Sequence, residues 1–368
     1  MITIKKRLFM YLPINYNEAQ CLKEVINSRV EYLKYQFLVP PLLMHVVKIK
    51  AFSGLVDLIP AQEERETVSS IAKRMQACIA INGANYRRGG KYNGNRVNLC
   101  FIKNNIFADP CYLRGALAWS GSETCWIIDT ISSCIELTIG TKKFPVHGIN
   151  QPRGIGQSIL YNTNDVRCFH HNPGYAVFIC NDRIDAIQRK DFSFILDYDF
   201  IYQTDTIEDI NLGMKVDLSY NLKTADNHQI KPDFALGGAG LLLKNSSICP
   251  LSEEFSYSLP LIHMADEISA DFNPRAQQDF LINVSHPRTA FGVDVEKNVY
   301  LVVVDGRQKA SIGITLYDLA RFMQFLGCKE AINLGGGGCS TLYCNGLVLN
   351  QPSQGYERTV SEALCFFV

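Results

Sequence analysis

The sequence predicts an α+β fold in which mostly antiparallel, partly mixed sheets are covered by a few helices on one side. Two observations lead to this prediction. Short β-rich runs alternate with turn residues over much of the chain, and few segments repeat apolar residues at helical spacing. Apolar residues make up 47% and charged residues 20% of the 368 residues, which is typical of a globular chain with a sizeable core.

Charge and cysteine content exclude several classes of protein. Lys+Arg and Asp+Glu both number 36, so the chain lacks the basic excess expected of a nucleic-acid binder or a polybasic membrane binder. The 13 cysteines are scattered without CxxC spacing, and we expect them to be reduced and mostly buried. This pattern favours a cytoplasmic location, including the cytoplasm of a host into which the chain is delivered. The apolar run at residues 8–12 is too short for a secretion signal or a membrane span.

The first part of the chain is expected to be an amphipathic helix over residues 17–39, with Asn17 as its N-cap and Pro40 ending it. Its apolar positions recur at helical spacing: Leu22, Val25, Ile26, Val30 and Leu33. Residues 1–44 are therefore predicted to be a helical extension, and residues 45–368 a single domain. Within the domain, β-rich runs bounded by turns predict strands at 45–52, 77–81, 97–102, 135–139 and 177–180.

The last eighty residues give the clearest pattern. Val299–Val304 is a continuous apolar run, as in a buried strand. Thr315 and Asp318 resemble a capping box at the start of a helix that ends at Gly327. A strand over 331–334 follows, and Asn345-Gly346 predicts a hairpin between 341–344 and 347–349.

Four consecutive glycines, residues 335–338, lie between these last strands. They form either a tight turn that needs positive φ or a bare-backbone pocket whose N–H groups bind an anion. Neither a Walker loop nor a dinucleotide-binding fingerprint fits, because no lysine and no helix follow the glycines. No metal or other cofactor is expected, since the adjacent His170 and His171 point to opposite sides of a strand.

Other polar residues stand where predicted strands begin or end, so each could reach a pocket. Asp305 follows a buried strand, and its alternative is a plain Asp-Gly turn. Arg288 precedes a strand and could clamp a phosphate or form a surface salt bridge. The remaining pairs of this kind are Asn82-Gly83 and Glu357-Arg358.

The order of these motifs resembles the phosphodiester glycosidase family. The matching segments are Asn82-Gly83, Gly148 to Arg153, Gly237 to Gly240, Arg288-Thr289, Asp305-Gly306-Arg307, Asn333-Leu334, Gly336-Gly337-Gly338, Ser340-Thr341, Asn345-Gly346 and Glu357-Arg358. The resemblance spans residues 45–368 and is strongest over 286–365. Two positions depart from it: the family's Asp in the glycine motif is Gly335 here, and the first Ser after the glycines is Cys339.

The resemblance implies hydrolysis at the anomeric carbon of a phosphate-bearing sugar, through an oxocarbenium-like transition state. It assigns Asp305 as base or stabiliser of that transition state, with Glu357 as the other matched carboxylate. It also assigns Arg288 and Arg307 to the phosphate. Further substrate contacts are expected from Asn82, Gly83, Asn333, Gly336, Gly337, Gly338, Ser340, Thr341 and Arg358, with residues 336–338 acting as an anion nest of main-chain amides.

Three other functions stay open at this point. A cytoplasmic relative could remove ADP-ribose from a protein side chain, which is also cleavage of an anomeric bond beside a phosphate. A chain without the loop Asp could bind a phosphosugar and not hydrolyse it. Cys339 could act as a nucleophile with His286 as its base.

Overall fold

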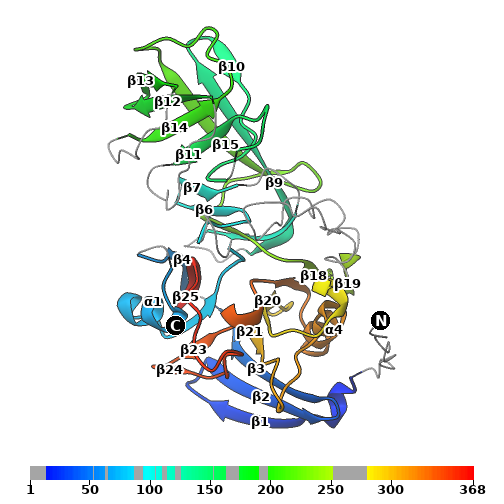
Figure 1. Ribbon diagram of the computed structural model, residues 1–368. Coiled ribbons are helices and arrows are strands. Elements are labelled where there is room, and N and C mark those ends of the chain that lie inside the picture. Colours follow the sequence, from blue (N-terminus) through cyan, green and yellow to red (C-terminus); the bar gives the residue numbers. More distant parts are fainter. Residues whose placement is uncertain are drawn as a thin grey trace, which may run out of the picture.

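The computed structural model describes residues 14–52, 54–62, 65–86, 94–103, 105–109, 114–120, 126–151, 153–162, 174–189, 198–251 and 280–368. These residues form two lobes (Figure 1). Strands from the beginning and the end of the chain build the lower lobe, and the middle of the chain builds the upper one. The predicted features at residues 1–13 and at His170-His171 lie outside the described residues.

Two antiparallel sheets form the lower lobe. The larger sheet has the order β1 (Gln20–Val25), β2 (Val30–Leu38), β3 (Pro41–Ile49), β21 (Val299–Val304), β20 (Arg288–Val293), β22 (Glu330–Asn333), β18 (Leu241–Lys244) and β19 (Ser247–Ile248). The smaller sheet has the order β24 (Leu347–Val348), β23 (Leu342–Cys344), β5 (Ile79–Asn82), β25 (Glu362–Phe367) and β4 (Leu55–Pro60).

Side-chain alternation along the strands stacks these sheets into a sandwich with a helix on each outer face. In β21, Leu301 and Val303 point into the core between the sheets, whereas Val302 and Val304 point towards α4 (Leu316–Phe325). In β25 the residues facing the inner core include Phe366, and the opposite face packs on α1 (Val68–Met75). Helices therefore cover both outer faces, and the prediction that they lie on one side was wrong.

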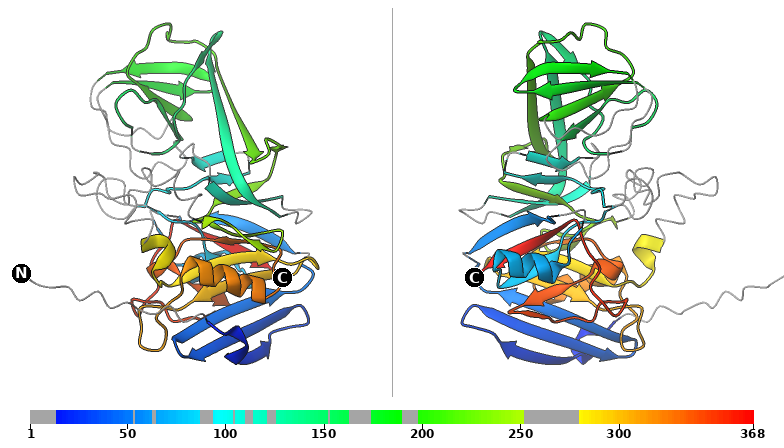
Figure 2. Two further views of the ribbon diagram at one scale, coloured as in Figure 1. Left: turned by 90° about the vertical axis from the view of Figure 1, so that its right-hand side faces the viewer. Right: turned by 60° about the vertical axis from the view of Figure 1, so that its left-hand side comes forward.

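The upper lobe contains two further antiparallel sheets. One has the order β16 (Gln229–Ile230), β15 (Val216–Thr224), β9 (Ile127–Ile139), β8 (Arg114–Trp119), β17 (Phe234–Gly237), β6 (Cys100–Ile102) and β7 (Asn105–Ala108), with β10 (Lys142–Phe144) paired to β9. The other consists of β11 (Ile159–Asn162), β14 (Phe200–Thr204), β12 (Tyr175–Cys180) and β13 (Arg183–Gln188). The long pair β9–β15 runs the height of this lobe (Figure 2).

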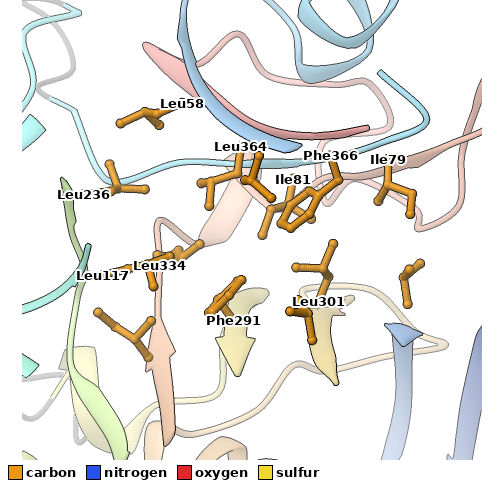
Figure 3. Packing of buried hydrophobic residues seen from close by; sticks show 14 of the residues in the cluster. Leu58, Ile79, Ile81, Leu117, Leu236, Phe291, Leu301, Leu334, Leu364 and Phe366 are labelled. Atoms are coloured by element: carbon orange, nitrogen blue, oxygen red, sulfur yellow. The ribbon is translucent and has the colours of Figure 1, made fainter. Parts of the chain in front are cut away.

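The two lobes share one hydrophobic core. Leu117 of β8 and Leu236 of β17 pack in the same cluster as Leu334, Phe291 and Leu364 of the sandwich (Figure 3). This apolar contact packs the upper lobe against the end of the sandwich where β5 ends.

The predicted N-terminal helix is wrong. Residues 20–38 form the hairpin β1–β2, and the boundary proposed between residues 44 and 45 falls inside β3. Asn27 makes the turn, since its side chain accepts hydrogen bonds from the amides of Arg29 and Val30. Strand β2 buries apolar residues on both faces. Apolar and polar residues therefore do not alternate along it, and the spacing of its apolar residues resembles that of a helix.

The C-terminal predictions are confirmed. Strand β21 spans the predicted residues, and Thr315 caps α4 by accepting a hydrogen bond from the Asp318 amide. Asn345 and Gly346 both have positive φ, as a two-residue hairpin turn requires. Among the described residues, no helix combines the length and the apolar character needed to cross a membrane.

Candidate active site

Most of the predicted site residues meet at one end of the sandwich because its strands are antiparallel. Strands β5, β21 and β22 end there, at Asn82, beside Asp305 and at Asn333. Strand β20 begins there with Arg288, since Arg288 pairs with Val304 at the end of β21. The glycine run leaves β22 at this same end and leads into β23.

Asn82 fixes the glycine run to the sandwich. Its Nδ2 donates to the main-chain oxygens of Gly83 and Gly335, at 3.1 and 2.7 Å. Its Oδ1 accepts from the Thr289 hydroxyl at 2.8 Å and from the Thr341 amide at 3.1 Å. Asn82 is fully buried, so it holds both ends of the loop from beneath and does not reach solvent itself.

The glycine run is a tight turn, and two of its four amides donate to main-chain oxygens of the protein. Residues Gly337–Cys339 form one turn of 3-10 helix, and Gly337 has a φ of +69°. The Gly335 amide donates to Gly83 O and the Gly337 amide to Pro287 O, at 2.9 and 2.8 Å. The predicted nest of three converging amides is therefore wrong: the Gly337 amide already has a protein partner.

Arginine side chains cover the glycines instead. A Cβ on Gly337 would lie 3.4 Å from Arg307 Nη2, and a Cβ on Gly338 would overlap the guanidinium of Arg358. Arg307 is exposed, and Gly336, Gly337 and Arg358 are half-buried. These four residues form a solvent-accessible, positively charged surface, which we call the arginine face. Paired guanidinium groups suit the oxygens of a phosphate.

Arg307 is held in an unusual backbone conformation. Its φ is +60°, in the left-handed region that non-glycine residues rarely adopt. A Cβ on the preceding Gly306 would lie 2.7 Å from the Pro287 nitrogen, so the chain turns tightly against residue 287. This conformation directs Arg307 over the glycine run, and such local strain is concentrated at functional sites.

Arg288 lies below this face and is only 5% exposed. Its guanidinium donates to the main-chain oxygens of Ile314, Leu281 and Val284. Burial, and secondly the nearby charge of Arg307, lower the pKa of Arg288 to about 9. The structure thus assigns Arg288 to the support of the site, in place of the predicted phosphate contact.

Asp305 is likewise part of the support. It is 2% exposed, and its carboxylate accepts hydrogen bonds from His45 Nε2, Asn350 Nδ2 and the Gln351 amide. His45 in turn bonds the Tyr32 hydroxyl, at 2.7 Å. Because every oxygen of this carboxylate is occupied by a buried donor, the predicted role of Asp305 as a base facing the substrate does not fit the geometry.

Glu357 serves a different element. Its Oε2 accepts from the Ser69 amide, in the first turn of α1. A carboxylate at this position stabilises the helix N-terminus. The structure therefore gives Glu357 a structural contact that the sequence did not predict, while its neighbour Arg358 reaches the glycine run.

Sequence reasoning missed two buried residues beside Asn82. Glu362 Oε2 accepts from Arg96 Nε at 2.7 Å, with both side chains at most 2% exposed, and Glu362 Oε1 accepts from the Ala84 amide. A Cβ on Gly83 would lie 2.6 Å from this carboxylate, so Gly83 leaves space for Glu362 and lies beneath the site. Only the spatial approach of β25 to β5 reveals this pair, since 266 residues separate Arg96 from Glu362.

Three buried side-chain oxygens near the loop have no hydrogen-bond partner among the described residues: Asn333 Oδ1, Ser340 Oγ and Thr341 Oγ1. Buried polar atoms are seldom left in this state, so they call for a polar ligand or an ordered water molecule. Asn333, Ser340 and Thr341 are, however, at most 2% exposed, as Asn82 is, so an ordered water molecule can serve as the partner and substrate binding by these three residues remains a prediction.

The structure does not fit the hypothesis that Cys339 is a nucleophile with His286 as its base. Cys339 is buried, and its Sγ lies 3.9 Å from both the Tyr86 hydroxyl and Arg358 Nη1. His286 bonds Arg307 and Phe280 O through its two ring nitrogens, so it is not the base of Cys339.

In the part of the chain that the structure describes, no group of three or more His, Cys, Asp or Glu side chains could hold a metal ion.

The sequence profile of the phosphodiester glycosidase family matches residues 176–367, which include β20 to β25 and the glycine run. The chain belongs to this family. Membership agrees with the resemblance of the motifs and with the mostly antiparallel fold. The missing loop Asp at Gly335 remains an inference from the motif alone.

Individual relatives match shorter segments. The chain is similar to the SPbeta prophage-derived uncharacterized protein YomE of Bacillus subtilis, at 40% identity over 23% of this chain and 13% of the relative. It is also similar to the mouse N-acetylglucosamine-1-phosphodiester alpha-N-acetylglucosaminidase, at 35% identity over 23% of this chain and 17% of the relative. Both alignments thus cover less than a fifth of the relative.

A solved structure extends the similarity of fold to nearly the whole chain. A hypothetical protein from Synechocystis superposes with a TM-score of 0.74 at 17% identity, over 95% of this chain and 64% of the other. The upper lobe, which the family profile covers only in part, therefore belongs to a fold seen elsewhere.

Proposed function

We propose that this phosphodiester glycosidase hydrolyses the bond between the anomeric carbon of a sugar and a phosphate oxygen. The arginine face is the observation that carries the proposal. Arg307 and Arg358 bring two positive charges to the glycine run, while the nearby carboxylates of Asp305 and Glu362 accept hydrogen bonds from buried partners. A site of this charge suits a phosphodiester, whose leaving group is an anion.

The reaction forms one bond and breaks one. The oxygen of water bonds to the anomeric carbon, and the bond from that carbon to the phosphate oxygen breaks with its electron pair leaving on the phosphate. A phosphate monoester is a weak base and needs little protonation, so guanidinium groups beside it can stabilise the leaving charge. The proton lost by water passes to solvent or to a basic group.

The name of the mouse relative suggests the sugar. We infer that an α-linked N-acetylglucosamine 1-phosphodiester is the substrate class to test first, since the identity to that enzyme is 35% where the two align. The ADP-ribosyl alternative has no support from the family or from these relatives. The cytoplasmic location stays a prediction.

The test is incubation of the protein with UDP-N-acetylglucosamine in water enriched in ¹⁸O. Hydrolysis at the anomeric carbon yields N-acetylglucosamine carrying ¹⁸O and unlabelled UDP, both measured by mass spectrometry. Label in the nucleotide or in the sugar phosphate would show cleavage at phosphorus and contradict the proposal. Arg307→Gln is expected to lower the rate at least tenfold, whereas Arg321→Gln, an exposed change on α4, is the matched control.

Binding of the same compound without turnover would favour the phosphosugar-binding module. Calorimetry distinguishes this outcome, because a heat of binding with no product in the labelling experiment fits a chain whose loop Asp is absent. Lack of both binding and turnover would show that the sugar or the leaving group differs from the one named here.

A further inference from the structure

His286 lies two residues before β20 and contacts Arg307 of the arginine face. Its Nδ1 lies 3.3 Å from Arg307 Nη2, and its Nε2 lies 3.2 Å from Phe280 O. The side chain is buried, with the Phe280 ring packed against it at a centroid distance of 4.5 Å. The sequence singled out His286 only as a base for Cys339, a role that these contacts exclude.

These two contacts define the proton on the ring. A guanidinium has donors and no acceptor, so His286 Nδ1 must be the acceptor of the Arg307 bond. A main-chain oxygen only accepts, so Nε2 must carry the hydrogen that is donated to Phe280 O. His286 is therefore neutral, with its hydrogen on Nε2. Burial, followed by the charges of Arg288 and Arg307, lowers its pKa to about 4, which agrees with this form.

The position of the Arg307 guanidinium follows from this bond. One nitrogen is hydrogen-bonded to His286, and the group lies so close to Gly337 that a Cβ added there would be in van der Waals contact with it. The backbone of Arg307 has positive φ, so its side chain starts from a restricted direction. A flexible exposed arginine would lose side-chain entropy on binding an anion, and an anchored one has already lost it.

We propose that His286 is a positioning residue that orients Arg307 over the glycine run for an anionic ligand. It does not touch the substrate. The inference rests on the proposed function only in the identity of that ligand, a sugar phosphate. Its physical content is that a neutral acceptor at this place raises the affinity of the arginine face for phosphate.

Inorganic phosphate is the probe, and its affinity is measured by calorimetry on the full chain. His286→Leu removes the acceptor and is expected to weaken phosphate binding about tenfold, the loss of one charge-assisted hydrogen bond. His286→Asn can offer Oδ1 near the place of Nδ1, so it is expected to stay within about threefold of the unsubstituted protein. His228→Leu, at an exposed histidine in the upper lobe, is the matched control.

A second readout concerns the ring itself. In the ¹⁵N spectrum of the histidine rings, His286 is expected to show the form with hydrogen on Nε2, and Arg307→Gln is expected to change that signal. Such a spectrum needs no ligand and no activity, so it stays informative where His286→Leu fails to fold.

Several results would overturn the proposal. These are equal phosphate affinities of the His286→Leu variant and the unsubstituted protein, no phosphate binding by the latter, or a ring with its hydrogen on Nδ1. By contrast, a failure to hydrolyse UDP-N-acetylglucosamine while the affinities differ as expected would end the proposed substrate and leave the positioning role intact.

Discussion

The buried pair of Arg96 and Glu362 gives the sharpest test of how the site is supported. Glu362 lies on β25 and pairs with Arg96, while its other oxygen holds the Ala84 amide beneath Gly335. The side chains are 2% and 1% exposed and their charged atoms are 2.7 Å apart. Breaking a buried ion pair by removing one of its two partners costs about 3–5 kcal/mol.

Glu362→Gln keeps the shape of the side chain and an acceptor for Ala84, so its effect isolates the charge. We expect it to lower the free energy of unfolding by about 3–5 kcal/mol, and Arg96→Met to do the same. The double variant removes both charges and should lose less than the sum of the two, by about 2 kcal/mol or more.

Urea unfolding followed by tryptophan fluorescence measures these changes, because both tryptophans of the chain, Trp119 and Trp126, pack together at the junction of the lobes. Asp209→Asn is the control, since its ion pair with Lys142 is more than half exposed on both sides and should contribute less than about 1 kcal/mol. Additive effects of the two substitutions, or a loss below about 1 kcal/mol for Glu362→Gln, would refute the reasoning.

Two further predictions concern the same end of the sandwich. His286 has a folded-state pKa of about 4, below the ordinary value of 6.5, because of burial and then the charges of Arg288 and Arg307, while its ring also donates to a main-chain oxygen. Its stabilising contribution is therefore complete above pH 6.5 and is lost as the pH falls towards 4. Across that range we expect the free energy of unfolding to fall roughly 3 kcal/mol further in the unsubstituted chain than in the His286→Asn variant, measured by urea titration at several pH values. At Gly335, a Cβ would lie 2.6 Å from Ala84 O, so Gly335→Asp should lower stability by about 1–3 kcal/mol in thermal unfolding and should not raise hydrolysis. A more active or more stable Gly335→Asp chain would contradict that expectation.

The C-terminal part of the fold could be predicted because its signals are local. A capping threonine, a continuous valine-rich strand and an Asn-Gly turn each fix a few neighbouring residues, and Thr315, β21 and Asn345 lie as expected. The N-terminal hairpin could not be predicted from its spacing. Strand β2 is buried on both faces, and the apolar pattern of such a strand does not differ from that of a helix over a few turns.

The location of the site was predicted more accurately than the roles of its residues. Motif order brought Asn82, Asn333, Arg307 and the glycine run to one end of the sandwich, where the structure has them. It could not tell which side chains face solvent, because burial depends on partners far along the chain. Asp305 bonds His45, a residue 260 positions away, and nothing local in the sequence signals that contact.

A complex with N-acetylglucosamine 1-phosphate tests the central claim most directly, namely that the arginine face binds the phosphate of a sugar phosphate above a buried polar support. In a crystal structure of that complex, the phosphate oxygens should lie within about 3.2 Å of the guanidinium nitrogens of Arg307 and Arg358. The sugar should point towards Asn333, Ser340 and Thr341. A phosphate bound in the upper lobe, or one bound at this end without either arginine, would contradict the account.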